Sequence, residues 1–109
     1  MITVTVLREK GNPVGFTVTG HAGCGAYGED LVCAAVSAVV QTAVLGITEG
    51  LKLKAGFSVS EGDTTCILDR EASESEQHDA AIVFNTMLLG LRSVQSAYPR
   101  TLKFRSKEV

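Results

Sequence analysis

The sequence predicts an α+β fold: a two-layer sandwich in which two helices cover a mostly antiparallel sheet, in the order ββαββα(β). Two observations predict it. Short segments with apolar side chains at every second position occur in pairs, and two longer segments between them carry apolar side chains at helical spacing. The 109 residues are 45% hydrophobic and 20% charged. This size and composition fit one folded domain, which we place at residues 1–109.

The first pair of strands is expected at residues 2–8 and 14–19. Residues 2–8 alternate between apolar and polar side chains, which is typical of a strand with one buried face. Residues 11–13 read Gly-Asn-Pro and supply turn chemistry, because Gly and Asn tolerate left-handed backbone and Pro fixes φ. The two strands are therefore predicted to form a hairpin.

A glycine-rich loop and a long apolar helix come next. Residues 20–28 contain four glycines, which disfavour both helix and strand and predict a loop. Asp30 is expected to cap a helix that runs to about Glu49, with Gly50 as its stop. This helix is apolar almost all round, so it must be covered on more than one side. A partner subunit would supply such a cover.

The second half of the chain repeats the pattern of hairpin and helix. Residues 53–60 and 64–69 are expected to form strands joined by a turn at 61–63. Ser73 and Glu76 have the spacing of a capping box, which predicts the start of the second helix. Its apolar stripe is expected to face the core: Phe84, Met87, Leu88, Leu91, Val94 and Tyr98. Pro99 should end the helix, and residues 101–104 are a candidate last strand.

Charge and apolar content exclude several function classes. The net charge of −2 and the absence of a basic stripe argue against direct nucleic-acid binding. The N-terminus lacks the pattern of a signal peptide, and the apolar stretch at residues 31–45 is interrupted by polar residues and short for a bilayer span. We therefore expect a cytoplasmic protein without membrane contact. Its three cysteines should be reduced thiols.

Cys33 and His21 are the strongest candidates for catalytic residues. With Asp30 as cap, Cys33 falls in the first turn of the helix, where unpaired N–H groups and the helix dipole favour a thiolate. His21 follows a strand and opens the loop that leads to this turn, so its imidazole can reach the thiol. Such a pair is suited to nucleophilic catalysis. On composition alone, a cysteine in this position is more often a small core residue, and His21 more often a surface or hydrogen-bonded histidine.

Other polar residues admit two interpretations each. His21, Cys24, Cys33 and Cys66 add up to a zinc ligand set, although only the first two are closely spaced. Asp30 is a helix cap or a residue that orients His21. Ser37 lies one turn beyond Cys33, where its hydroxyl supports the site or bonds back to the carbonyl of Cys33. Separately, Cys66 is expected to be buried and inert, and His78 to be solvated.

The segments Gly20–Ala22 and Gly28–Ser37 together resemble the signature of the ribosomal-processing cysteine protease (Prp) family. The order of strands and helices and the segment 88–99 are also similar, so the resemblance covers essentially the whole chain. It implies a cytosolic endopeptidase, usually a homodimer and without a cofactor. Its substrate would be the N-terminal extension of a large-subunit ribosomal protein, a short hydrophobic segment with an aromatic pair before the scissile bond.

The resemblance also assigns roles to individual residues. It implies Cys33 as nucleophile and His21 as general base and acid, with Asp30 and Ser37 at motif positions of less certain role. The intervening loop, with Gly23, Gly25 and Gly28, would order around the substrate. Cys24 departs from the family pattern. An extended apolar peptide could be held between this loop and a sheet edge by strand addition.

Two other classes of function remain open at the level of sequence. One is a ribosome-associated binding module without catalysis, in which Cys33 is no more reactive than Cys24 or Cys66. The other is a small zinc-stabilised domain, which chelation would unfold.

Overall fold

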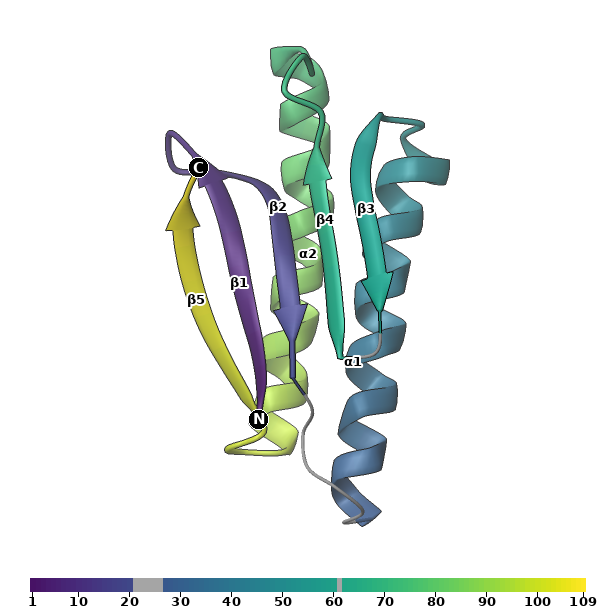
Figure 1. Cartoon of the computed structure of the whole chain (residues 1–109), viewed down its shortest axis with the longest axis vertical. Helices are drawn as coiled ribbons and strands as arrows, with labels where there is room; N and C mark the ends of the chain where they lie inside the picture. The colour runs from purple at the N-terminus through teal and green to yellow at the C-terminus, as the bar shows by residue number, and fades with distance from the viewer. Residues whose placement is uncertain (21–26, 61) are drawn as a thin grey trace.

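The computed structural model describes residues 1–20, 27–60 and 62–109, and for residues 27–30 it describes the backbone. One sheet of five strands lies against two helices on one of its faces (Figure 1). The predicted two-layer sandwich is confirmed. The elements follow the chain as β1 (Ile2–Glu9), β2 (Asn12–Thr19), α1 (Tyr27–Leu45), a π-helical turn η1 (Gly46–Gly50), β3 (Ala55–Ser60), β4 (Asp63–Leu68), α2 (Glu74–Ala97) and β5 (Leu102–Glu108).

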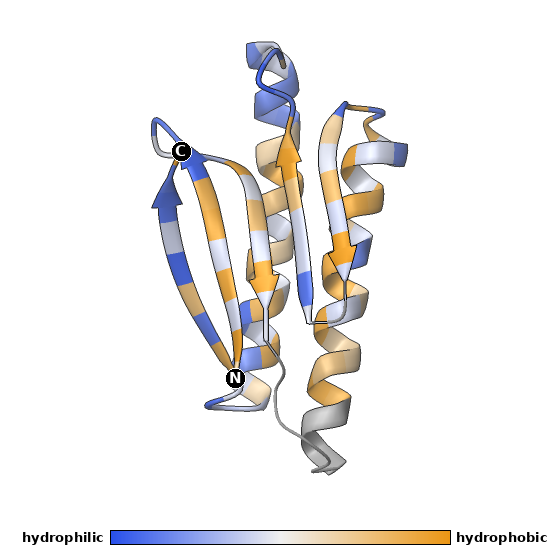
Figure 2. Cartoon of the chain, viewed as in Figure 1, coloured by the Kyte–Doolittle hydropathy of each residue, from blue (hydrophilic) through white to orange (hydrophobic). Residues whose placement is uncertain are grey.

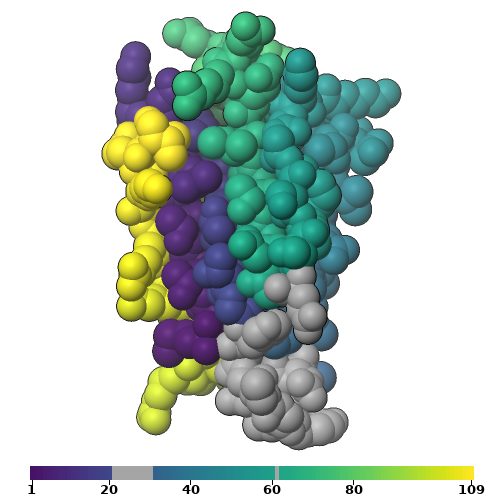
Figure 3. All heavy atoms as spheres, viewed as in Figure 1, coloured from purple at the N-terminus to yellow at the C-terminus, as the bar shows by residue number. Residues whose placement is uncertain are grey.

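The strands lie in the order β3-β4-β2-β1-β5. Every neighbouring pair is antiparallel except β1 and β5, which run parallel with Ile2 opposite Leu102 and Arg8 opposite Glu108. The candidate last strand is confirmed as β5, which is longer than the predicted residues 101–104. Figure 3 shows the outer face of this sheet, from β5 in yellow to the β3–β4 hairpin in teal. The two edges of the sheet are therefore β3 and β5.

The core fills the space between the sheet and the helices. The alternation in β1 directs Ile2, Val4 and Val6 towards the helices, where all three are buried. Phe16 of β2 meets Phe84 of α2 edge to face, with ring centroids 6.0 Å apart. This is a favourable aromatic geometry, and it joins the sheet to α2 at the centre of the core.

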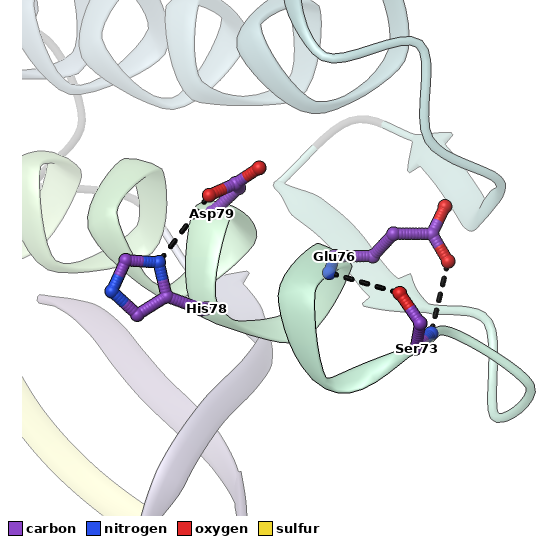
Figure 4. Close-up of polar contacts among 4 residues, drawn as sticks. All are labelled: Ser73, Glu76, His78 and Asp79. Carbon is purple, nitrogen blue, oxygen red and sulfur yellow. Dashed lines mark hydrogen bonds and ion pairs between the residues drawn. The ribbon is translucent and has the colours of Figure 1, made fainter.

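α2 starts with the capping box that the sequence predicts. The hydroxyl of Ser73 accepts a hydrogen bond from the backbone N–H of Glu76 at 3.1 Å, and the Glu76 carboxylate accepts one from the N–H of Ser73 at 2.9 Å (Figure 4). The predicted apolar stripe is buried or half-buried as far as Val94. Its last member is wrong, because Tyr98 lies beyond the helix end at Ala97 and is exposed.

α1 starts earlier than the sequence suggests. It begins at Tyr27, so Gly28 and Glu29 belong to the helix, and Asp30 lies in its first turn instead of capping it. Acidic residues in a first turn are favourable beside the positive end of the helix dipole, which accounts for helix before Asp30. The predicted loop therefore ends at residue 26. Its residues 21–26, with Gly23 and Gly25, lie outside the described part of the chain.

α1 and η1 together cover residues 27–50, a longer segment than the predicted helix from the Asp30 cap to about Glu49. Judged by length and composition only, residues 31–50 are long enough and apolar enough to cross a membrane. One side of this segment lies in the core, however: Val32, Val36, Val40, Ala43, Val44 and Ile47 are all buried there. We interpret α1 as the central helix of a two-layer fold. Its opposite side is open, with Leu31 and Leu45 about half exposed.

Candidate active site

A hollow of about 290 Å³ lies between α1 and the nearby ends of β2, β3 and β4. We call it the Cys33 hollow. From α1 it is lined by Cys33, Val36, Ser37 and Gln41. From the sheet side it is lined by Ile2, Val18, Gly20, Val59, Ser60, Gly62, Asp63 and Thr64. The two predicted residues whose side chains are described, Cys33 and Ser37, are thus brought to one concave surface.

Gly20 fixes where β2 ends in this hollow. Its N–H donates to the carbonyl of Gly62 at 2.9 Å, which ties the end of β2 to the β3–β4 hairpin. Gly20 has φ +91°, and a Cβ there would lie 2.5 Å from the carbonyl oxygen of Met1. Only glycine fits without a shift. The next residue is His21, which, like Cys24, lies outside the described residues. Gly20, the last described residue before His21, therefore lies on the wall of the Cys33 hollow.

The rotation of α1 about its axis determines where Cys33 lies. Val32, Val36 and Val40 face the core at i, i+4 spacing, and Cys33 lies one residue round from that face, half-buried at the rim of the hollow. It is in the second turn of the helix because α1 begins at Tyr27. The prediction that Cys33 sits in the first turn is therefore wrong. The N–H groups without helical partners belong to residues 27–30.

Ser37 lies one turn further along the same face and is exposed in the hollow. Three threonines on the helices bond back to the carbonyl four residues earlier: Thr42, Thr48 and Thr86. Among the described residues the hydroxyl of Ser37 has no such partner. The interpretation in which it bonds back to Cys33 is therefore not supported, and its hydroxyl is available to the hollow.

Cys66 is separate from this site. It is fully buried on β4, and this burial raises the pKa of its thiol to about 11. It does not line the Cys33 hollow. The predicted zinc set is therefore divided between a buried strand position, a helix and a segment outside the described residues. In the part of the chain that the structure describes, no three potential ligands cluster. His78 is exposed, as predicted, with Nδ1 3.3 Å from Asp79 (Figure 4).

Comparison with known proteins decides the family. A family model described as cysteine protease Prp matches residues 1–103. The chain belongs to the Prp family.

Relatives and solved structures are similar to the chain over nearly all of their length. The ribosomal processing cysteine protease Prp of Staphylococcus aureus strain Mu50 is 26% identical over 98% of this chain and 100% of its own. SMU.848 from Streptococcus mutans has a TM-score of 0.82 and 27% identity, covering 100% of this chain and 96% of its own. A structure of the S. aureus Prp with a covalently linked product peptide has a TM-score of 0.80 and 27% identity, covering 98% of this chain and all of its own.

Sequence reasoning missed the sheet side of the Cys33 hollow. Val59, Gly62 and Thr64 come from the β3–β4 hairpin, which is distant from Cys33 along the chain and carried no motif. Gln41 had a signal, because Cys33, Ser37 and Gln41 are spaced four residues apart and share a helix face.

The two described cysteines should differ in reactivity. With a pKa of about 11, Cys66 is about 0.1% thiolate at pH 8 and is also shielded from solvent, whereas Cys33 borders the hollow. We expect iodoacetamide at pH 8 to alkylate Cys33 in the folded protein and to leave Cys66 unmodified, as read by peptide mapping. Reaction in denaturant should label both. Equal labelling of the two in the folded protein would contradict the assignment.

Proposed function

We propose that this Prp-family chain is an endopeptidase that removes the N-terminal extension of a large-subunit ribosomal protein, with Cys33 as nucleophile and His21 as general base. The observation that carries the proposal is that Cys33 lines a hollow whose wall includes Gly20, the residue immediately before His21. Because His21 follows Gly20 directly in the chain, we infer that its imidazole approaches the thiol. A thiol beside an imidazole is the arrangement that nucleophilic catalysis needs.

The reaction would proceed by acyl transfer. His21 takes the proton of the Cys33 thiol, and the sulfur attacks the carbonyl carbon of the scissile peptide bond. His21 then returns the proton to the leaving amine, and water releases the acyl group from Cys33. Ser37 lies next to Cys33 along the hollow, where its hydroxyl can donate to the substrate. Asp30 remains a candidate for orienting His21.

Peptide complexes of a relative support the choice of substrate class. The S. aureus Prp structures include one with a substrate peptide and one with a covalently linked product peptide, and both share this fold with TM-scores of 0.80. Cys33 and Ser37, the two candidate site residues whose side chains are described, lie at one hollow. We therefore assign the peptide site of this chain to the Cys33 hollow.

We propose that the working form is a cytoplasmic homodimer joined through the helices. The outer side of the helix layer has an apolar hollow of about 550 Å³, which we call the α1–α2 hollow. Small residues of α1, η1 and α2 line it and let a second copy approach closely: Ala38, Ala43, Gly46 and Gly90. A second copy would also cover Leu31 and Leu45. A cytoplasmic location fits a ribosomal substrate and free thiols at Cys33 and Cys66.

The test is cleavage of a synthetic peptide with a hydrophobic segment that ends in an aromatic pair. We expect the purified, reduced protein to cut it once, directly after the aromatic residues, as read by mass spectrometry. A scrambled peptide of the same composition should stay intact. If the folded protein leaves the first peptide uncut over hours, the proposal fails and a binding module without catalysis is favoured.

A further inference from the structure

The two edges of the sheet are protected to very different degrees. β5 carries Lys103, Arg105 and Lys107 at alternate exposed positions, which is a common way to stop an edge strand from pairing with another chain. β3 reads Ala-Gly-Phe-Ser-Val-Ser and has no charge and no proline. Figure 2 shows the contrast, with blue hydrophilic positions along β5 and none along the β3 arrow. The free edge of β3 is thus open to strand addition.

Apolar side chains accompany this open edge. One row of opposed residues crosses the sheet on its helix side: Val6, Phe16, Cys66 and Phe57. The first three members are buried, but Phe57, at the β3 end, is 53% exposed. The next row ends likewise in Val59, which is 55% exposed and lines the Cys33 hollow. Phe57 and Val59 therefore face the helix layer without being covered by it.

The backbone of β3 presents free groups at these same two residues. The N–H of Asp69 donates to the carbonyl of Lys54, which makes Lys54 and Asp69 a hydrogen-bonded antiparallel pair. Since such pairs alternate along the ladder, Gly56 and Ser58 also direct their backbone groups towards β4. Ala55, Phe57 and Val59 then direct their N–H and C=O groups away from β4, along the free edge. A strand added there would find backbone partners beside exposed apolar side chains.

We propose that the peptide substrate adds to β3 as a sixth strand, with Phe57 and Val59 contacting its apolar side chains. The inference rests on the proposed function and adds where the extension binds. Its main support is continuity: Val59 and Ser60, at the end of β3, line the hollow that also contains Cys33. The residues before the scissile bond must run towards Cys33, and β3 runs the same way, so the added strand is parallel to β3.

A second copy of the chain is the main rival occupant of this edge. It is less suited, because the apolar α1–α2 hollow on the outer side of the helix layer already offers a second copy a place to pack. An extended peptide with hydrophobic side chains matches both features of the β3 edge, which are its free backbone N–H and C=O groups and its exposed apolar side chains. Backbone pairing gives affinity to any sequence, and side chains at alternate positions give selectivity.

The decisive test is an N-methyl scan of the peptide. Cys33→Ala protein would be titrated with fluorescent peptides, each carrying one N-methyl group at a successive position before the scissile bond. Strand addition predicts weaker binding by about tenfold at alternate positions, because only every second N–H pairs with β3. A single sensitive position, or no sensitive position, would overturn the inference. Because binding is measured in a variant that lacks the nucleophile, an alternating pattern together with failure of the unsubstituted protein to cut the peptide would count against the proposed function only.

Side-chain variants test the contribution of Phe57 and Val59. We expect Phe57→Ser and Val59→Ser to raise KM for the aromatic-ended peptide about tenfold each, with the rate of Cys33 alkylation unchanged. Leu89→Ser is the matched control, since Leu89 is an exposed apolar residue on α2. An equal effect of all three variants would overturn the inference. Dissociation of the dimer, seen by sedimentation in Phe57→Ser and Val59→Ser but not in Leu89→Ser, would also overturn the inference. It would assign the β3 edge to a second copy of the chain.

Discussion

Replacing Cys33 by alanine is expected to lower kcat/KM for the aromatic-ended peptide by about 1,000-fold or more. The reason is that alanine has no nucleophile, so the acyl intermediate cannot form, and only the much weaker contribution of binding and orientation remains. Steady-state cleavage followed by mass spectrometry would measure the loss. Peptide affinity should change little, because the substitution removes one sulfur atom from the rim of the hollow.

The fold should survive this substitution. Cys33 is only half-buried, so its truncation is expected to change the free energy of unfolding by less than about 1 kcal/mol. Ser37→Ala is the matched control, because Ser37 lines the same hollow on the same helix. Its loss of kcat/KM should be about tenfold or less, as for removal of one hydrogen bond. Cleavage that persists in Cys33→Ala would refute the assignment of the nucleophile.

Replacing Phe84 by alanine is expected to lower the free energy of unfolding by about 3–5 kcal/mol. Phe84 is 1% exposed and packs edge to face on Phe16, so the substitution removes apolar burial and leaves a cavity where α2 meets the sheet. Urea unfolding followed by circular dichroism would measure the change. Small domains have a total stability of about 5–15 kcal/mol, so this variant should be close to unfolding at 37 °C.

Phe57→Ala provides the comparison for this prediction. The chemical change is the same, but Phe57 is more than half exposed on the edge strand β3, so the loss should be about 1 kcal/mol or less. The two variants thus separate a core phenylalanine from one that we assign to peptide binding. If Phe57→Ala destabilised the protein as much as Phe84→Ala, Phe57 would be a core residue and not a binding surface.

Much of the fold could be predicted because the signals are local. The period-two alternation in residues 2–8 determines which side chains of β1 are buried, and the Ser73–Glu76 pair determines where α2 begins. Errors occurred where a local signal was weak or misread. Asp30 has the chemistry of a cap, yet α1 begins three residues earlier, and this moves Cys33 from the first turn to the second. Tyr98 continues the apolar spacing of α2 but lies past its end.

The sequence by itself determined the two-layer class, most element positions, the burial of Cys66, and Cys33 and His21 as the candidate catalytic pair. All of these follow from residue type and spacing within about ten residues, or from a motif. Only the tertiary structure decided that β5 pairs in parallel with β1, which leaves β3 as the other edge. It alone placed Val59 and Thr64 beside Cys33 and left Phe57 uncovered. Strand order and the coverage of an edge depend on contacts between distant segments, and such contacts have no local signal in the sequence.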